Sequence, residues 1–372
     1  MDIAVIIPLY NGAKWIGATL DSVAAQTRAP EEIIVVDDGS TDESPSIANE
    51  FSGVSVIENP GGDGPASARN RGARVAEAEG LAFLDQDDLW HPTHLQTLHR
   101  ALERRSECVG AFSNTTSFQA SESPTFSVDD CSPESYNPWT DYPRNRLGQP
   151  AGALVRRGPF DRVDGWPTEF AACDDYHLWL KLGIVGDFVR TGGTTAAHRI
   201  HEASYSQSQR AEEFERYYER FVDASENALQ LRDRMRGDGD AYRPRLDAQK
   251  ALLDLLKALR RGDATAMREA ARNFGLHASQ ESKPVILNLW NNFVWFIAPI
   301  IDQMGMDQFA VEVISLLHDW PPRAERPRRI LYEWAVGRAS SAELVKRHPT
   351  MPRYWRLFLQ RCSRKAKTLV DA

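Results

Sequence analysis

The sequence predicts an α/β protein in which a largely parallel sheet is followed by an all-α region. Up to about residue 115, short apolar runs rich in β-branched residues alternate with helix-like stretches. This pattern is typical of βαβ units joined by right-handed crossovers. Acidic residues directly follow two of the apolar runs, and after about residue 206 the chain becomes charged and permissive for helices.

Strands and helices are expected to alternate through this first part. The expected strands are the apolar runs at residues 3–7, 33–36, 54–57, 81–84 and 109–112. The helices between them are expected at about residues 13–26, 42–51, 66–78 and 92–105. The first run follows Met1-Asp2 without a basic segment or a cleavage site, so we expect a strand there and not a signal peptide.

The alternation ends after the fifth strand. Residues 115–150 are rich in Ser, Thr, Pro, Asn and Asp, which predicts a long surface loop beside the site and a candidate lid. We then expect a strand at 151–156, turns at 161–169, a helix at about 174–184, and two β-like runs before His201. The length of 372 residues exceeds one ordinary domain. We therefore predict a sheet domain at residues 1–206 and a helical domain at residues 207–372.

The composition is that of a globular protein and argues against a dedicated nucleic-acid binder. Apolar residues make up 42% of the chain and charged residues 26%, and the formal net charge is −8. The four cysteines form no CxxC pair and match neither a zinc site nor a small disulfide framework. We expect a reduced, cytoplasmic location and no nucleic-acid partner.

Two segments near the C-terminus raise the question of membrane contact. Residues 284–301 are strongly apolar, but three asparagines and Pro299 interrupt them, so a buried or interfacial helix is favoured over a membrane span. Residues 346–367 mix basic and aromatic side chains, as do helices that rest on an anionic membrane surface. The alternative is a solvated helix face. The expectation is peripheral contact with the inner face of the membrane through the C-terminal helices.

Two carboxylates stand where a buried strand is expected to end. Asp85-Gln86-Asp87 closes the apolar run at residues 81–84, and open α/β sheets bind ligands outside the carboxyl ends of their strands. Mg²⁺ and Mn²⁺ prefer oxygen ligands and usually take a few carboxylates together with substrate phosphates. The pair therefore predicts a metal site for a nucleotide diphosphate, with Asp87 as the favoured ligand. The alternative is an N-cap or a surface turn, a role that also suits Asp88.

Residues at two other strand ends are suited to binding a nucleotide. Pro8 and Tyr10 follow the first strand and Asp38 follows the second. An aspartate there can accept the imide N–H of a uracil while an aromatic ring covers the base, whereas the alternative is an ordinary turn. Arg69, near a helix start, can meet a diphosphate, with Arg71 in reserve. The alternative for both arginines is a solvated helix face.

Five motifs, in this order, resemble those of glycosyltransferase family 2, a family of the GT-A fold. They are Pro8-Leu9-Tyr10-Asn11, Asp37-Asp38-Gly39-Ser40-Thr41-Asp42, Ala68-Arg69-Asn70-Arg71-Gly72, Leu84-Asp85-Gln86-Asp87-Asp88, and Asp174-Asp175-Tyr176-His177-Leu178-Trp179-Leu180-Lys181. Each motif is weak to moderate by itself, but five in register are specific. They cover roughly residues 1–206, and nothing after about residue 210 adds to the resemblance.

The resemblance implies an inverting transfer from a nucleotide-sugar donor, with a UDP-sugar favoured. The roles that it implies at the donor are base binding by Pro8, Tyr10 and Asp38, ribose or diphosphate contact by Arg69, ribose and metal contact by Asp85, and metal binding by Asp87. The metal would be Mn²⁺ or Mg²⁺. The acceptor would be a glycan or a lipid-linked glycan.

The resemblance also implies a catalytic base at the start of the later helix, namely Asp175 with Asp174 as the alternative. The sequence departs from the family here, because Asp174 stands where Glu is common, His177 where an acid is common and Lys181 where Arg is common. His201 resembles a family histidine that would complete the metal site. A surface or satisfied histidine is the alternative.

Two other functions compete with the transferase. A sugar-phosphate nucleotidyltransferase would have a glycine-rich phosphate loop at the first strand exit, which Leu9-Tyr10-Asn11-Gly12 lacks. A non-catalytic glycan-binding or assembly protein could keep the fold without turnover, but the acids at the expected site are intact. The donor base, the sugar, the linkage and the oligomeric state are open at this point.

Overall fold

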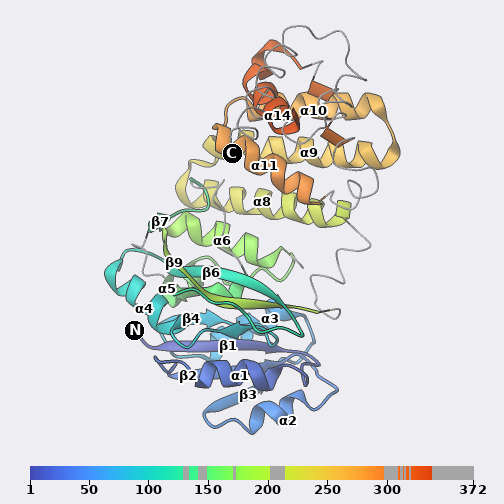
Figure 1. The fold of residues 1–372 in the computed structure, drawn as a ribbon. Coiled ribbons are helices and arrows are strands. Elements are labelled where there is room, and N and C mark those ends of the chain that lie inside the picture. The colour runs from blue at the N-terminus through green and yellow to red at the C-terminus, as the bar shows by residue number, and fades with distance from the viewer. Residues whose placement is uncertain are drawn as a thin grey trace, which may run out of the picture. The chain divides into compact units, whose positions relative to one another are not determined.

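The computed structural model describes residues 1–128, 134–140, 149–170, 173–201, 214–296, 309–310, 313, 316–317 and 320–336. The chain divides into two compact units, Met1–Leu253 and Asp254–Ala372. The first contains the whole sheet, and the described part of the second is helical (Figure 1). The first unit also includes α8 (Phe214–Arg236), which packs against α6 (Asp174–Val185). A domain boundary at 206/207 stays a prediction.

Four parallel strands form one half of the sheet, as predicted. They are β3 (Val54–Glu58), β2 (Glu32–Asp37), β1 (Ile3–Leu9) and β4 (Gly80–Phe83), in that spatial order. All seven residues of β1 are buried, because helices cover both faces of a parallel sheet. The apolar runs of the sequence therefore coincide with the central strands.

The other half of the sheet is mixed. β8 (Ala153–Arg156) runs antiparallel between β4 and β6 (Gly110–Gln119), and β9 (Phe188–Ile200) runs parallel to β6. The short strands β5 (Leu89–Trp90) and β7 (Glu134–Tyr136) pair antiparallel with β9. The two β-like runs expected before His201 thus form one long strand. β8 is therefore the strand at which the direction of the central sheet reverses.

Helices pack on both faces of the sheet (Figure 1). One apolar core contains α1 (Ile16–Ala24), α2 (Ser44–Asn49) and α4 (His94–Arg104), and the other contains α3 (Pro65–Val75), α5 (Arg157–Arg162) and α6. Strand β1 serves both cores, because Val5 faces the first and Ile6 the second. Because β1 is packed on both faces, the position of its end, where predicted site residues lie, is well defined.

The remaining elements are helices. They are α9 (Arg243–Arg261), α10 (Ala264–Ala278), α11 (Lys283–Phe296) and α14 (Glu325–Val336), with short 3₁₀ turns at Pro150–Gly152, Gly239–Tyr242 and Pro322–Ala324. The predicted apolar helix is α11, and its residues Ile286 and Phe293 are buried. Within the described ranges, every helix is too short or too polar to span a membrane.

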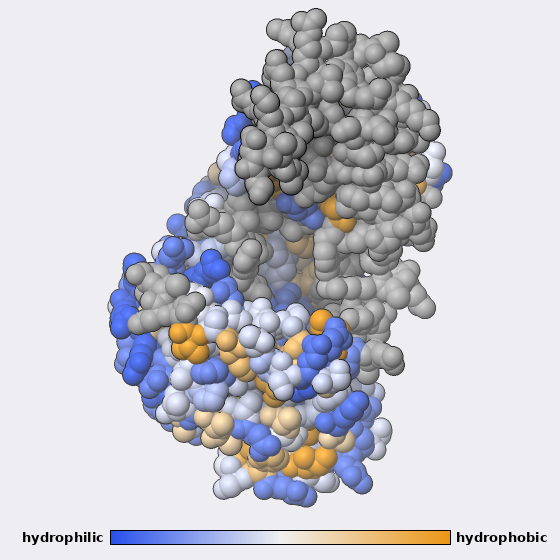
Figure 2. All heavy atoms as spheres, viewed as in Figure 1, coloured by the Kyte–Doolittle hydropathy of each residue, from blue (hydrophilic) through white to orange (hydrophobic). Residues whose placement is uncertain are grey.

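The surface of the first unit is mostly hydrophilic in the view of Figure 2, where hydrophobic residues form small separate groups. The predicted lid begins with the end of β6 and includes β7, while its residues 129–133 and 141–148 lie outside the described residues. The basic and aromatic segment at residues 346–367 also lies outside them. Cys108 and Cys173 are buried free thiols.

Candidate active site

The ends of β1, β2 and β4 meet at one edge of the sheet. Leu9 pairs with Asp37 in the register of β1 and β2, and the Asp38 amide donates a hydrogen bond of 2.8 Å to the Leu9 carbonyl. On the other side of β1, the Leu84 amide donates to the Ile6 carbonyl at 3.1 Å. The loops that follow these strands are therefore neighbours, which is where a ligand was expected.

Gln86 ties two of these loops together. Its Oε1 accepts a hydrogen bond of 2.8 Å from the Tyr10 amide, and its Nε2 donates one of 3.0 Å to the Tyr10 carbonyl. A Cβ at Gly12 would lie 2.5 Å from Gln86 Oε1, so only glycine leaves room for this pair. Tyr10 is 57% exposed as a residue, while Pro8 is buried in β1. Gln86 was not among the predicted site residues, although its place between two acids at a strand exit was an available signal.

Asp38 is buried and holds the loop between β3 and α3. Its Oδ1 accepts a hydrogen bond of 2.5 Å from Asn59 Nδ2, and its Oδ2 accepts one of 2.9 Å from the amide of Gly64. Gly64 precedes α3 with a φ of 89°, a left-handed conformation that favours glycine. Asn59 was not predicted as a site residue either, although it stands directly after β3. A role for Asp38 at the base stays a prediction.

Arg69 joins the acid at the strand edge to the acid on α6. Its Nη2 donates to Asp85 Oδ1 at 2.5 Å, and its Nη1 donates to Asp174 Oδ2 at 3.0 Å. The guanidinium lies 4.5 Å from the ring centre of Trp166 and is only 5% exposed as a residue. Burial acts to lower the pKa of Arg69, but the two carboxylates raise it above its ordinary value. The reserve candidate, Arg71, is exposed.

We expect the Arg69→Met substitution to lower the free energy of unfolding by roughly 2–3 kcal/mol. It would leave Asp85 and Asp174 facing each other in a poorly solvated site without their shared cation. Urea unfolding at neutral pH measures the loss. The matched control is Arg71→Met on the same helix, for which a change within about 0.5 kcal/mol is expected. Equal losses in the two variants would contradict a structural role for the Arg69 bridge.

Asp87 and His201 lie together although they are 114 residues apart. His201 Nε2 is 2.8 Å from Asp87 Oδ2. Burial raises the pKa of Asp87, as does the charge of Asp85, while the hydrogen bond with His201 opposes the shift. The ring of Trp15 lies 5.1 Å from the His201 ring, and Arg199 Nε donates to the Asp87 carbonyl at 2.8 Å. His201 is thus a partner of Asp87, not a surface histidine.

Asp88 has a structural position and is not a surface turn. It is fully buried, its Oδ1 accepts a hydrogen bond of 3.0 Å from the Arg199 amide, and the same oxygen lies 3.1 Å from His198 Nδ1. Burial raises the pKa of Asp88 to about 7, against the opposing effect of His198. These contacts attach the acidic loop to β9.

The predicted metal ligands are only partly gathered. Among the residues that the structure describes, no three His, Cys, Asp or Glu side chains form a group that could hold a metal ion. Asp87 and His201 are in contact, whereas Asp85 Oδ1 is turned to Arg69. Two protein ligands fit a cation whose other ligands are diphosphate oxygens. An imidazole ligand suits Mn²⁺ better than Mg²⁺.

Asp174 and Asp175 occupy the first turn of α6. Asp175 Oδ1 accepts a hydrogen bond of 2.6 Å from the amide of Tyr176. Burial, and then the charge of Asp174, raise the pKa of Asp175 to about 7. Burial also raises the pKa of Asp174, but Arg69 opposes that shift. The two acids therefore differ in their partners, because Arg69 binds Asp174 directly.

The two departures further along α6 are both buried. His177 Nε2 lies 2.9 Å from Asn227 Oδ1 of α8, and burial lowers the pKa of His177 to about 3, so the ring is neutral. Lys181 Nζ donates to the Asp164 carbonyl at 3.4 Å, and burial lowers its pKa to about 8. The histidine that stands at position 177 in place of the family's usual acid therefore contacts Asn227 of α8. No sequence signal pointed to Asn227.

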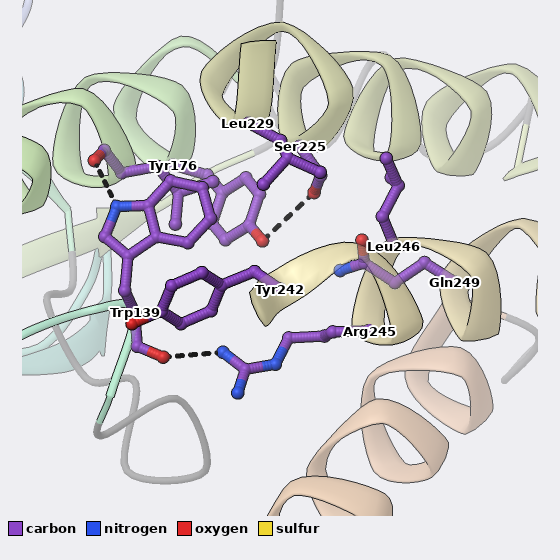
Figure 3. Close-up of a pocket in the computed structure, with 9 residues that line it drawn as sticks. Trp139, Tyr176, Ser225, Leu229, Tyr242, Arg245, Leu246 and Gln249 are labelled. Carbon is purple, nitrogen blue, oxygen red and sulfur yellow. Dashed lines mark hydrogen bonds between the residues drawn. The ribbon is translucent and has the colours of Figure 1, made fainter. Parts of the chain in front are cut away.

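Figure 3 shows how α6 is fastened to α8 and α9. The Tyr176 hydroxyl lies 3.2 Å from Ser225 Oγ, Trp139 Nε1 donates to the Leu180 carbonyl at 2.7 Å, and Arg245 Nη1 donates to the Trp139 carbonyl at 2.7 Å. The cavity between these side chains has a volume of about 20 Å³, which is room for about one water. The cavity is a small gap among the side chains that pack around Tyr176, the neighbour of Asp175.

A family model and several relatives of known sequence match part of this chain. Residues 4–158 match the family model described as Glycosyl transferase family 2. An uncharacterized glycosyltransferase of Haemophilus influenzae is 26% identical over 180 residues, which cover 48% of this chain and 61% of that protein. The Escherichia coli protein named UDP-Glc:alpha-D-GlcNAc-diphosphoundecaprenol beta-1,3-glucosyltransferase WfgD is 27% identical over 241 residues, which cover 61% of this chain and 88% of that protein.

A solved structure matches the fold over most of the chain. The crystal structure of S. aureus TarS 1-349 in complex with UDP-GlcNAc has a TM-score of 0.54, a sequence identity of 17%, and coverage of 91% of this chain and 93% of that chain. At this identity the likeness concerns the fold alone. It confirms the expected GT-A architecture with a helical C-terminal region.

Proposed function

We propose that this chain, whose residues 4–158 match the model of glycosyltransferase family 2, is a member of that family and moves a sugar from a nucleotide-diphosphate sugar to a hydroxyl of a glycan or lipid-linked acceptor. A UDP-sugar is the favoured donor, as the named activity of the E. coli relative and the UDP-GlcNAc bound by TarS support. The observation that carries the proposal is the Arg69 bridge. Arg69 forms ion pairs with Asp85, at the sheet edge where the donor is proposed to bind, and with Asp174 on α6.

Asp175 is the proposed base. Arg69 binds an oxygen of Asp174 and favours its ionised form, so that acid is better suited to positioning. Asp175 has a pKa raised to about 7, which suits a carboxylate that accepts a proton near neutral pH. It removes the acceptor hydroxyl proton while that oxygen attacks the anomeric carbon from the face opposite the diphosphate. One such displacement inverts the configuration.

The other proposed site residues bind the nucleotide-sugar donor. Tyr10 and Asp38 bind the nucleobase of the donor, and Pro8 lines the same pocket. Asp85 approaches the ribose. Negative charge builds on the departing diphosphate, and a bound Mn²⁺ or Mg²⁺ stabilises such charge as a Lewis acid. Asp87 and His201, with Asp85 beside them, would hold that ion.

A ligand screen tests this function. Purified protein is heated with UDP, GDP and dTDP and with their sugars, each with and without Mn²⁺. A ligand at about 100 times its Kd should add about 2.7 kcal/mol to the stability of the folded form. Nucleoside diphosphate release in the presence of glycan acceptors then identifies turnover.

The same screen separates the competing functions. Stabilisation by glycans alone, with no effect of any nucleotide, would favour the non-catalytic glycan-binding protein. Pyrophosphate release from a nucleoside triphosphate and a sugar phosphate would favour the nucleotidyltransferase. The cytoplasmic location and the peripheral contact with the inner membrane face stay predictions.

The turnover of the native enzyme should depend on pH through Asp175. Its carboxyl must be ionised to accept a proton, so we expect kcat to fall about tenfold per pH unit below a pH of about 7. Rates at saturating substrates between about pH 5 and pH 9 measure this profile. The residual rate of Asp175→Asn should lack that acidic limb. An identical limb in the variant would assign it to another group.

Asp38→Ala should mainly weaken donor binding. The substitution removes the carboxylate that is proposed to accept a hydrogen bond from the nucleobase of the donor. It also removes the hydrogen-bond partner of Asn59 Nδ2 and of the Gly64 amide. We expect the donor KM to rise about 10- to 100-fold with a smaller change in kcat. Asp38→Asn retains one acceptor oxygen and should show an intermediate effect. A loss confined to kcat would contradict the donor role.

A further inference from the structure

The second compact unit contains a groove beside α11 and α14. Its volume is about 370 Å³, and it is lined by Lys283, Arg326, Arg329, Ile330 and Glu333. A volume of this size falls in the range of small-ligand sites. Three of the five lining residues are cations, although the chain as a whole carries a net charge of −8. The local excess of positive charge is therefore a property of this groove.

Two of the cations are uncompensated. Lys283 Nζ lies 3.3 Å from Glu333 Oε2, so these two charges pair with each other. The side chains of Arg326 and Arg329 form no hydrogen bond or ion pair with any residue in the described ranges. Arg328, on the same helix, does pair with Glu325. Because residues three apart share a helix face, the two guanidinium groups of Arg326 and Arg329 stand together at the groove.

We propose that this groove binds a phosphate group. Guanidinium groups recognise phosphate through two parallel N–H···O bonds, and two of them can share one dianion. Ile330 is buried and lines the same groove as the two exposed arginines, so it can offer an apolar surface to their methylene stems. The phosphate could belong to a lipid headgroup or to a soluble molecule, and the chemistry of recognition is the same. This site is separate from the proposed reaction.

The full chain is tested with two probes. Co-sedimentation with phosphatidylcholine vesicles, with and without about 30% phosphatidylglycerol, tests the lipid source. Calorimetric titration with pyrophosphate tests the soluble source. The groove variant is Arg326→Gln with Arg329→Gln. The control variant is Arg323→Gln with Arg328→Gln, which changes the net charge equally at exposed or paired residues outside the groove.

The groove variant should bind the responsive probe roughly 30-fold more weakly, about fivefold for each arginine, while the control keeps most of its affinity. Binding of vesicles alone identifies a lipid headgroup, and binding of pyrophosphate alone identifies a soluble phosphate. A third variant, Glu333→Gln, removes the acid and should bind more tightly, an effect that unfolding cannot produce. The proposal is overturned if neither probe binds, or if the two double variants lose the same affinity.

Discussion

The Asp175→Asn variant is expected to turn over about 10²- to 10⁴-fold more slowly than the native enzyme, with the donor KM nearly unchanged. Asparagine keeps the shape of the side chain and can accept the hydrogen bond that Asp175 Oδ1 takes from the Tyr176 amide. It cannot accept a proton from the acceptor hydroxyl. Initial rates at varied donor and acceptor concentrations measure the effect.

The matched control is Asp174→Asn, one residue away on the same helix turn. This variant loses the charge that faces Arg69, so we expect a lower stability and a smaller fall in kcat. Circular dichroism before the assays separates loss of fold from loss of chemistry. If Asp174→Asn proved the slower enzyme, the assignment of base and positioning residue would have to be exchanged.

The second large effect is expected for Asp87→Ala, which should lower the metal-dependent rate at least about 1000-fold. Lewis-acid stabilisation of a departing diphosphate supplies several kcal/mol, and each tenfold in rate corresponds to about 1.4 kcal/mol. The variant also deprives His201 of its carboxylate partner. Titration of activity with Mn²⁺ should show a weaker apparent affinity as well as the lower rate.

Asp63→Ala is the control for Asp87→Ala. Asp63 is an exposed acid in the loop between β3 and α3, so its removal changes the net charge without touching the pair of Asp87 and His201. We expect near-native rates and the native response to Mn²⁺. Native activity in Asp87→Ala would remove the metal role of this acid.

The sequence predicts the parallel half of the sheet because burial on both faces leaves a local signature. The apolar run at the start of the chain became β1, and the run at residues 81–84 became β4 with the acids directly behind it. The direction of β8 carries no such signature. Whether a buried strand pairs parallel or antiparallel depends on partners far along the chain, and β8 pairs with β4 at a separation of more than 70 residues.

The candidate site was predictable where it follows strand ends and not where side chains meet across the fold. The motifs identified Asp85, Asp87 and the acids of α6 by residue type and order. They did not indicate that Arg69 binds two of those acids, because one contact spans 105 residues. Asn227 lies beyond the resemblance altogether, and its bond to His177 depends on the packing of α8 on α6.

The Arg69 bridge makes the acids on its two sides energetically interdependent. Neutralising Asp85 and Asp174 one at a time and then together should give a coupling free energy of about 0.5–3 kcal/mol in a double-mutant cycle. Replacing all three charged groups with uncharged residues of similar volume should harm the fold less than removing the guanidinium alone. Substitutions at Asp85, Arg69 and Asp174 should therefore be better tolerated as a set than one at a time.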